Sequence, residues 1–246
     1  MSRASTTKQD PELSIVIPAF NEVDRIGASL DKVKAFCQAQ RPETEVLVVD
    51  DGSVDRTAAL VVEMAKDWPQ LKVLQLERNR GKGFATRAGV LAATGKWILC
   101  SDADLSTPID FVEPMLEAGQ THPVVIGSRS IPGAQIARRQ PLHRVFMGRV
   151  FNWFVRTLAA PGCADSQCGF KLYRRDAGRD IFEGLTVDGF AFDVEVLFLA
   201  HRLGYAVAEV AVEWHNDERS KVSVLLDPAR MFVDVLRLRW RHRNLS

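Results

Sequence analysis

The stretch Trp97-Ile98-Leu99-Cys100-Ser101-Asp102-Ala103-Asp104 is an apolar run that ends in two carboxylates two residues apart. The run predicts a buried strand at 97–100, and side chains two residues apart in a strand point to the same face. If the chain stays extended, Asp102 and Asp104 share one face at the carboxyl end of the strand, where open α/β sheets bind ligands. Mg²⁺ takes one or two protein carboxylates and adds water and phosphate oxygens. The pair therefore predicts a divalent metal held jointly with a diphosphate; a solvated turn is the alternative.

Strand and helix patterns alternate on both sides of this stretch. Before it, the periodicity predicts strands at 13–17, 46–49 and 73–76 and helices at 22–38, 55–66 and 83–93. After it, we expect helices at 109–118, 143–160, 193–203 and 224–243, strands at 124–127, 170–173 and 206–214, and a polar loop at 128–140. The alternation predicts an α/β fold with a largely parallel central sheet flanked by helices and joined by right-handed crossovers.

Length and composition favour one enzyme domain. The 246 residues are 46% hydrophobic, and a net charge of +1 gives no general attraction to nucleic acid. The four cysteines lack a zinc-type Cys-x-x-Cys pair, so we expect buried free thiols and a cytoplasmic protein. We expect a disordered segment at 1–12, a catalytic domain at 13–223 with halves 13–127 and 128–223, and a C-terminal amphipathic helix at 224–246. No window is apolar enough to span a membrane, so any membrane contact is expected to be peripheral.

Polar clusters follow three of the predicted strands, and in a parallel sheet all three fall at one edge. Carboxylates there can accept hydrogen bonds from the base and ribose of a nucleotide, and a Gly-Lys-Gly segment can offer it backbone N–H groups and a cation. Turn and N-cap chemistry is the alternative for both features, and neither a Walker motif nor Gly-x-Gly-x-x-Gly is present. The candidate nucleotide-sugar residues are Pro18, Ala19, Asn21, Glu22, Asp50, Asp51, Ser53, Asp55, Gly81, Lys82, Asp102 and Ala103.

Four segments in this order resemble family 2 glycosyltransferases. They are Ile15-Val-Ile-Pro-Ala-Phe-Asn-Glu, Val48-Val-Asp-Asp-Gly-Ser-x-Asp-x-Thr, Asn79-x-Gly-Lys-Gly and Asp102-Ala-Asp. The resemblance implies a GT-A fold, a nucleotide-diphosphate sugar bound with Mg²⁺ or Mn²⁺, and inversion of the anomeric centre.

Further motifs extend the resemblance over nearly the whole chain. They are Gly127-Ser-Arg, Asp165-Ser-Gln-Cys-Gly-Phe-Lys, Phe192-Asp-Val-Glu, Val212-Glu-Trp and Arg219-Ser-Lys. These segments resemble the polyprenyl-phosphate enzymes, and dolichyl-phosphate glucosyltransferases more than mannose synthases. The resemblance implies catalytic roles for Asp102, Asp104, Arg129 and Asp193, and donor-sugar or metal contacts for Asp165 and Gln167; an N-cap is the alternative for Asp193.

The acceptor implied by this resemblance is a lipid phosphate, which is already ionised at neutral pH. Its attack on a sugar needs cations that gather two anionic substrates rather than a strong base. Arginine suits this task because its fork binds phosphate bidentately. The candidate acceptor-phosphate residues are Arg129, Arg138, Arg219, Ser220 and Lys221.

The predicted helices 143–160 and 224–243 each combine an apolar, aromatic face with several arginines. Trp153 and Arg149 exemplify the first, and Trp240 and Arg237 the second. Such a mixture is typical of helices that lie at a membrane surface, although core or dimer packing produces the same pattern. We expect peripheral contact with the cytoplasmic face of a membrane.

These observations favour a metal-dependent enzyme that moves glucose from UDP-glucose to a polyprenyl phosphate. Mannose transfer from GDP-mannose, or transfer to a soluble or protein acceptor, is the alternative within the same fold. A non-catalytic nucleotide-sugar-binding module is an alternative of another class, but it would need no acceptor cations. A dehydrogenase lacks support because the glycine fingerprint is missing.

Overall fold

The computed structural model describes residues 10–136, 162–215 and 226–243. The predicted disordered segment and the predicted helix at 143–160 therefore lie largely or wholly outside the described residues. The end of that first segment is ordered, because Pro11 and Glu12 accept backbone hydrogen bonds from Lys96 and Trp97 at 3.0 and 2.9 Å. Pro11 and Glu12, at the end of the predicted segment, are thus tied to the start of β4 (Trp97–Cys100).

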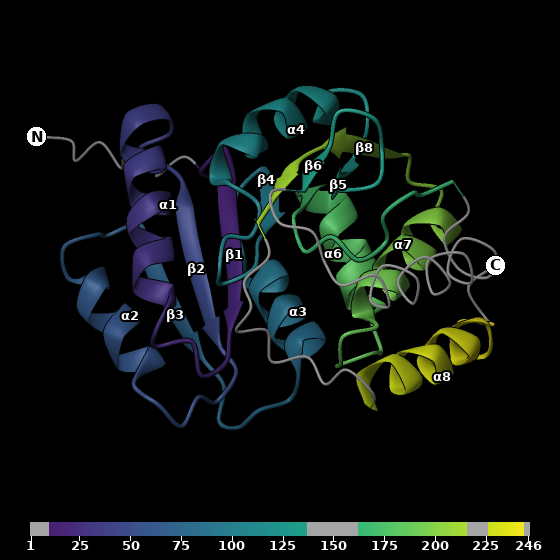
Figure 1. The fold of residues 1–246 in the computed structure, drawn as a ribbon, viewed down its shortest axis with the longest axis horizontal. Helices are drawn as coiled ribbons and strands as arrows, with labels where there is room; N and C mark the ends of the chain where they lie inside the picture. The colour runs from purple at the N-terminus through teal and green to yellow at the C-terminus, as the bar shows by residue number, and fades with distance from the viewer. Residues whose placement is uncertain (1–9, 137–161, 216–225, 244–246) are drawn as a thin grey trace, which may run out of the picture.

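A seven-stranded, mostly parallel sheet forms the centre of the molecule (Figure 1). Its order is β3-β2-β1-β4-β7-β5-β8, and a separate sheet pairs β6 with β9. The strands of the large sheet are β1 (Leu13–Ala19), β2 (Glu45–Asp50), β3 (Leu71–Gln75), β4 (Trp97–Cys100), β5 (Val124–Ser128), β7 (Lys171–Arg174) and β8 (Val207–Ala211); those of the small sheet are β6 (Gln135–Ile136) and β9 (Glu213–Trp214).

Helices cover both faces of the sheet and give a three-layer α/β/α sandwich (Figure 1). Side chains along β1 alternate between the layers: Val16 packs in one core cluster, and Ile15 and Ile17 in the other. Burial on both faces explains why β1, β2 and β4 are largely apolar runs. One face carries α1 (Ile26–Gln40), α2 (Thr57–Ala65), the 3₁₀ turn η1 (Ile109–Phe111) and α4 (Val112–Gly119); the other carries α3 (Lys82–Ala92), α6 (Arg175–Glu183) and α7 (Phe192–Arg202), with α8 (Leu226–Arg241) packed on α7.

The second half of the fold contains features that the sequence did not predict. Strand β7 runs antiparallel to both of its neighbours, β4 and β5, within the sheet that was predicted to be largely parallel. The predicted strand at 206–214 is divided at Val212, since β8 pairs with β5 in the large sheet and β9 with β6 in the small one. The α6 helix was not predicted. None of the described helices is long and apolar enough to cross a membrane.

All four cysteines, Cys37, Cys100, Cys163 and Cys168, are buried and unbridged, as the sequence predicted. Burial raises the pKa of the Cys37 thiol to about 11 and lifts that of Cys100 further above its usual value. Because the thiolate is the reactive form, we expect the native protein to react with a thiol reagent such as DTNB at pH 8 only slowly. All four thiols should react at once in denaturant. Rapid reaction of any of them in the folded protein would contradict this burial.

Candidate active site

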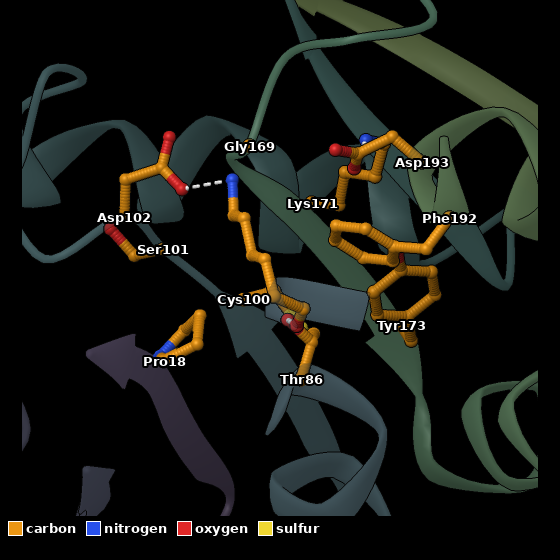
Figure 2. A pocket seen from close by; sticks show the side chains of 11 residues that line it. Pro18, Thr86, Cys100, Ser101, Asp102, Gly169, Lys171, Tyr173, Phe192 and Asp193 are labelled. Atoms are coloured by element: carbon orange, nitrogen blue, oxygen red, sulfur yellow. Dashed lines mark hydrogen bonds and ion pairs between the residues drawn. The ribbon is translucent and has the colours of Figure 1, made fainter. Parts of the chain in front are cut away.

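The candidate site lies where the strand order changes direction, beyond the carboxyl ends of β1 and β4. Open α/β sheets bind ligands at such a switch point, because the loops after the two strands leave a crevice between them. Figure 2 shows Pro18 and Asp102 on one side of the pocket and Lys171, Phe192 and Asp193 on the other. The pocket is lined by Pro18, Lys82, Thr86, Cys100, Ser101, Asp102, Gly169, Lys171, Tyr173, Phe192 and Asp193.

The loops after β1 and β2 are interlocked by Asn21. This residue adopts a φ of 54°, and its backbone N–H donates to Ser53 Oγ at 2.8 Å. Its Oδ1 accepts the backbone N–H of Val54 at 2.9 Å. The Asp55 carboxylate accepts from the Thr57 backbone N–H at 2.8 Å and so caps the start of α2. Asn21, Ser53 and Asp55 thus hold the shape of the loops that the sequence assigned to nucleotide binding.

Asp50 and Asp51, at the end of β2, differ in how their carboxylate oxygens are hydrogen-bonded. Both oxygens of Asp51 are occupied, by the backbone N–H groups of Arg80 at 2.9 Å and Gly81 at 2.8 Å, so Asp51 ties the loop before α3 to β2. Asp50 accepts the Ser53 N–H on Oδ2 at 3.2 Å, but its buried Oδ1 has no hydrogen-bond partner in the described structure. A buried acceptor without a donor is costly, which makes Oδ1 of Asp50 available to a ligand N–H or O–H. Burial raises the pKa of Asp51.

Asp102 forms an ion pair with Lys82 at the mouth of the pocket, at 2.6 Å (Figure 2). Burial alone would raise the pKa of Asp102, but the Lys82 ammonium outweighs it and holds that pKa below its usual value. Gly169 comes so close that a Cβ at this position would overlap the Asp102 carboxylate. The close approach explains why a glycine stands here, and it brings the segment before β7 against Asp102.

Asp104 does not continue the strand. β4 ends at Cys100, and the backbone carbonyl of Asp102 accepts the Leu105 N–H at 3.1 Å. Leu105 has a φ of 47°, so the two carboxylates lie in a turn. Asp104 Oδ1 accepts the N–H and the Oγ–H of Ser106, at 3.0 and 2.8 Å. The predicted extended geometry was wrong, because the short side-chain acceptor favours a turn. The turn still keeps the two carboxylates near each other.

The donor set fits a divalent cation that is completed by substrate oxygens. Burial and the neighbouring Asp102 charge raise the pKa of Asp104, and a cation would relieve this repulsion. Arg25 lies 3.5 Å from Asp104 and also pairs with Glu22, so Glu22 joins the network around the turn. No group of three or more His, Cys, Asp or Glu residues that could hold a metal occurs in the parts of the chain that the structure describes. Two carboxylates are what Mg²⁺ uses when a diphosphate supplies other ligands.

Lys171 and Asp193 form a buried ion pair at the back of the pocket. Lys171 donates to Asp193 Oδ1 and, at 2.7 Å, to the Cys168 carbonyl. Their side chains are only 2% and 9% exposed. The sequence suggested Asp193 but gave Lys171 no role, although a lysine flanked by Phe170 and Leu172 in an apolar strand could have marked it.

Arg129 forms a bidentate pair with Asp165. Its Nε and Nη2 donate to the two carboxylate oxygens at 2.7 and 2.9 Å, and its backbone N–H adds a third bond at 3.0 Å. The guanidinium also lies 5.3 Å from the Trp214 ring centre. The Gln167 N–H donates to Asp165 at 3.2 Å. Asp165 therefore orients Arg129 through its Nε, Nη2 and backbone N–H.

The structure brings most of the predicted residues to one edge of the sheet. Ala19 accepts the Asp51 N–H at 2.8 Å, and Ala103 is buried beside the carboxylate turn. His215 donates its backbone N–H to the Ser106 carbonyl at 2.8 Å and so borders the same turn. The predicted acceptor residues Arg138, Arg219, Ser220 and Lys221 lie outside the described residues.

Comparison with known proteins agrees with this geometry. The profile of glycosyl transferase family 2 matches residues 14–182. A dolichyl-phosphate beta-glucosyltransferase of Dictyostelium discoideum is 37% identical over 94% of this chain and 74% of its own length. The enzyme of the same name from Homo sapiens is 34% identical over 97% of this chain and 77% of its own. That from Saccharomyces cerevisiae is 33% identical, with coverages of 94% and 76%.

Solved structures share the fold. Glucosyl-3-phosphoglycerate synthase from Mycobacterium tuberculosis, in complex with Mn²⁺ and UDP-glucose, superposes with a TM-score of 0.68 and 18% identity. The match covers 93% of this chain and 79% of that one. Mannosyl-3-phosphoglycerate synthase from Rubrobacter xylanophilus gives a TM-score of 0.64 at 20% identity, covering 96% and 76%. The family profile matches most of the sheet, including the acidic turn after β4, and the curated relatives match nearly the whole chain. The chain therefore belongs to glycosyl transferase family 2.

Proposed function

We propose that this chain transfers a glucosyl residue from UDP-glucose to a polyprenyl phosphate, with inversion at the anomeric carbon and with Mg²⁺ or Mn²⁺ as cofactor. The observation that carries the proposal is the similarity to the dolichyl-phosphate beta-glucosyltransferases, at 33 to 37% identity over 94 to 97% of this chain. The site supports it, because the Lys82–Asp102 and Lys171–Asp193 ion pairs both line one pocket.

The donor half of the site is assigned to the carboxyl ends of β1, β2 and β4, with Lys82 from the start of α3. Asp102 and Asp104 would hold the metal, which when bound neutralises charge on the donor diphosphate. Lys82 adds a cation at the same place, and the carboxylates of Asp102 and Asp193 outweigh burial and hold its pKa above the usual value, so Lys82 is charged. The free Oδ1 of Asp50 suits an N–H or O–H of the nucleoside. Glu22, which is paired with Arg25, adds negative charge to the same rim.

The acceptor half is assigned to Arg129 and to the basic residues beyond the described segments, Arg138, Arg219 and Lys221 with Ser220. A phosphate oxygen of the lipid forms the new bond to the anomeric carbon as the bond to UDP breaks, and UDP leaves with the electron pair. The oxygen is already ionised, so the protein must mainly gather and orient two anions. Arg129 is suited to this because Asp165 holds its plane through Nε and Nη2, and a guanidinium carries further N–H donors on Nη1.

The C-terminal helix α8 supplies the surface that we assign to the membrane. Val235 and Leu238 are buried against the rest of the protein, whereas Val233, Leu236 and Trp240 are 41, 53 and 68% exposed on the other side. Figure 1 shows α8 at the edge of the molecule, away from the sheet. Arg237, Arg241 and Arg243 border this exposed stripe. An apolar stripe bordered by arginines is typical of helices that lie on an anionic lipid surface.

Changing Trp240 and Arg237 together to Ser is expected to weaken sedimentation with anionic vesicles and to slow transfer to long-chain acceptors. Each basic residue near such a surface contributes about 1 kcal/mol, and the exposed indole adds apolar burial. UDP-glucose binding should not change, because both side chains point away from the core. Salt should release the wild-type protein from the vesicles. A folded, nucleotide-binding protein that never sediments with anionic vesicles at low salt would contradict the membrane assignment.

The proposed reaction is tested by incubating the purified chain with a short polyprenyl phosphate and, in turn, UDP-glucose, GDP-mannose and UDP-N-acetylglucosamine. Each reaction is run with Mg²⁺, with Mn²⁺ and with EDTA, and the products are identified by mass. We expect a glucosyl polyprenyl phosphate and free UDP, only with metal. A mannosyl product, transfer only to a soluble acceptor, or nucleotide-sugar binding without any transfer would each overturn the proposal.

A further inference from the structure

Glu195 is a buried carboxylate in α7 that the proposed reaction does not use. It is 0% exposed, yet four donors surround it. Oε1 accepts from Thr186 Oγ1 at 2.6 Å and contacts His242 Nε2 at 2.6 Å, and Oε2 accepts the backbone N–H groups of Thr186 at 3.0 Å and Val187 at 2.7 Å. Two donors on each oxygen satisfy a buried carboxylate fully. Glu195 therefore joins two segments far apart in sequence, the turn before α7 and the end of the chain.

The turn held by Glu195 supports the start of α3. The carbonyl of Asp188 accepts the N–H groups of Gly83 at 2.8 Å and Phe84 at 3.2 Å. These N–H groups belong to the first helical turn, which no side chain caps, so Asp188 satisfies donors that would otherwise be orphaned. Gly81 has a φ of 108°, and a Cβ there would overlap the same carbonyl. The two segments are therefore packed backbone to backbone.

Lys82 is the residue placed by this packing. It lies between the two glycines and reaches the Asp102 carboxylate at 2.6 Å, and it lies near the Phe192 ring at the start of α7. A shift of the Asp188 carbonyl would move the first turn of α3 and, with it, the Lys82 ammonium.

The histidine that contacts Glu195 is placed by the C-terminal helix α8. His242 follows α8 directly, continues its hydrogen bonding through a bond to the Leu238 carbonyl at 3.0 Å, and is itself only 5% exposed. Its ring lies 5.8 Å from that of Phe198 in α7. The Trp240 side chain on the opposite face is exposed. One helix thus carries both the stripe that we assign to lipid and the histidine that reaches Glu195.

We propose that Glu195 and His242 are positioning residues that couple the seating of α8 to the placement of Lys82 at the donor diphosphate. The coupling runs from His242 through Glu195 to the segment 186–188, and from Asp188 to the first turn of α3. It rests on the proposed function in naming UDP-glucose as the ligand that Lys82 serves and a lipid surface as the seat of α8. It implies that a helix seated at a lipid surface and an ordered donor site support each other.

Hydrogen exchange in the full-length protein tests the relay without any assay of transfer. Exchange at the amides of Gly83, Phe84 and Val187 is compared between wild type, His242→Leu and His242→Gln. Leucine removes the donor to Glu195, whereas glutamine can place an N–H where Nε2 lies, so we expect faster exchange only in His242→Leu. Binding of UDP-glucose to His242→Leu should weaken at least ~10-fold, because small displacements of positioned groups are costly. The KM for a short polyprenyl phosphate, measured without vesicles, should stay unchanged.

Leu116→Ala in α4 is the matched control, since Leu116 is buried in the core on the opposite face of the sheet. It should lower Tm by a similar amount without changing exchange at Gly83 and Phe84. Three results would each overturn the relay. They are an equal increase of amide exchange at Gly83 and Phe84 in Leu116→Ala and His242→Leu, exchange in His242→Gln as fast as in His242→Leu, or wild-type exchange rates in His242→Leu. Faster exchange together with no binding of UDP-glucose by the wild type would instead overturn the proposed function and support the relay.

Discussion

Replacing Asp104 by Asn is expected to lower metal-dependent transfer about 1,000-fold, or ~4 kcal/mol of transition-state stabilisation, because one of two carboxylates in the proposed metal site loses its charge. The fold should survive. Asn keeps an oxygen that can accept the two hydrogen bonds from Ser106, at 3.0 and 2.8 Å, so the turn after β4 can form as before. The measurement is kcat against the concentration of Mn²⁺, which should no longer saturate in the range that saturates the wild type.

Asp110→Asn is the matched control for this prediction. Asp110 lies in η1, a few residues beyond the acidic turn, and its contact is an exposed hydrogen bond from Gln40 at 3.5 Å. It should retain wild-type activity and metal dependence, since it removes a carboxylate charge from outside the pocket. Full activity of Asp104→Asn at limiting metal would exclude Asp104 as a ligand and leave Asp102 with Lys82 as the diphosphate site.

The first half of the fold was predictable because its signals are local. β1, β2 and β4 are largely apolar runs buried on both faces, and the helices between the first four strands show apolar residues at helical spacing, so strand order in the chain implied parallel pairing. The direction of β7 was not predictable, because its four residues carry no mark of direction. Its antiparallel pairing with β4 and β5 depends on where the long connection before it returns to the sheet, and no residue in the strand encodes that path.

The site was predictable only as far as single motifs reach. The Asp102-Ala-Asp104 turn, the Asp50-Asp51 pair and the Gly-Lys-Gly segment were found as separate signals, and a parallel sheet brings them together. Their partners were not predictable, because they lie far away in the sequence. Both carboxylate oxygens of Asp51, for example, accept backbone N–H groups from Arg80 and Gly81, about thirty residues away. The Arg129–Asp165 and Lys171–Asp193 pairs likewise join residues 36 and 22 positions apart.

Replacing Lys171 by Met is expected to destabilise the protein by about 3 to 5 kcal/mol, the usual cost of leaving one member of a buried ion pair without its partner. Methionine keeps the length and apolar stem of lysine, so packing in β7 should change little. The Asp193 carboxylate would lose the Lys171 ammonium, and the Cys168 carbonyl would lose a donor at 2.7 Å. Urea denaturation monitored by circular dichroism gives the free energy of unfolding.

The double variant Lys171→Met with Asp193→Asn separates the lost pair from lost packing. Asn removes the buried charge while keeping the shape of Asp193, so the double variant should be more stable than Lys171→Met alone, by about 1 to 3 kcal/mol. Both variants should bind UDP-glucose poorly, because the pocket wall loses its charges whether or not the fold recovers. Additive losses of stability would show that the two side chains are energetically independent, and the buried contact between β7 and α7 would then have no role in holding the back wall of the pocket.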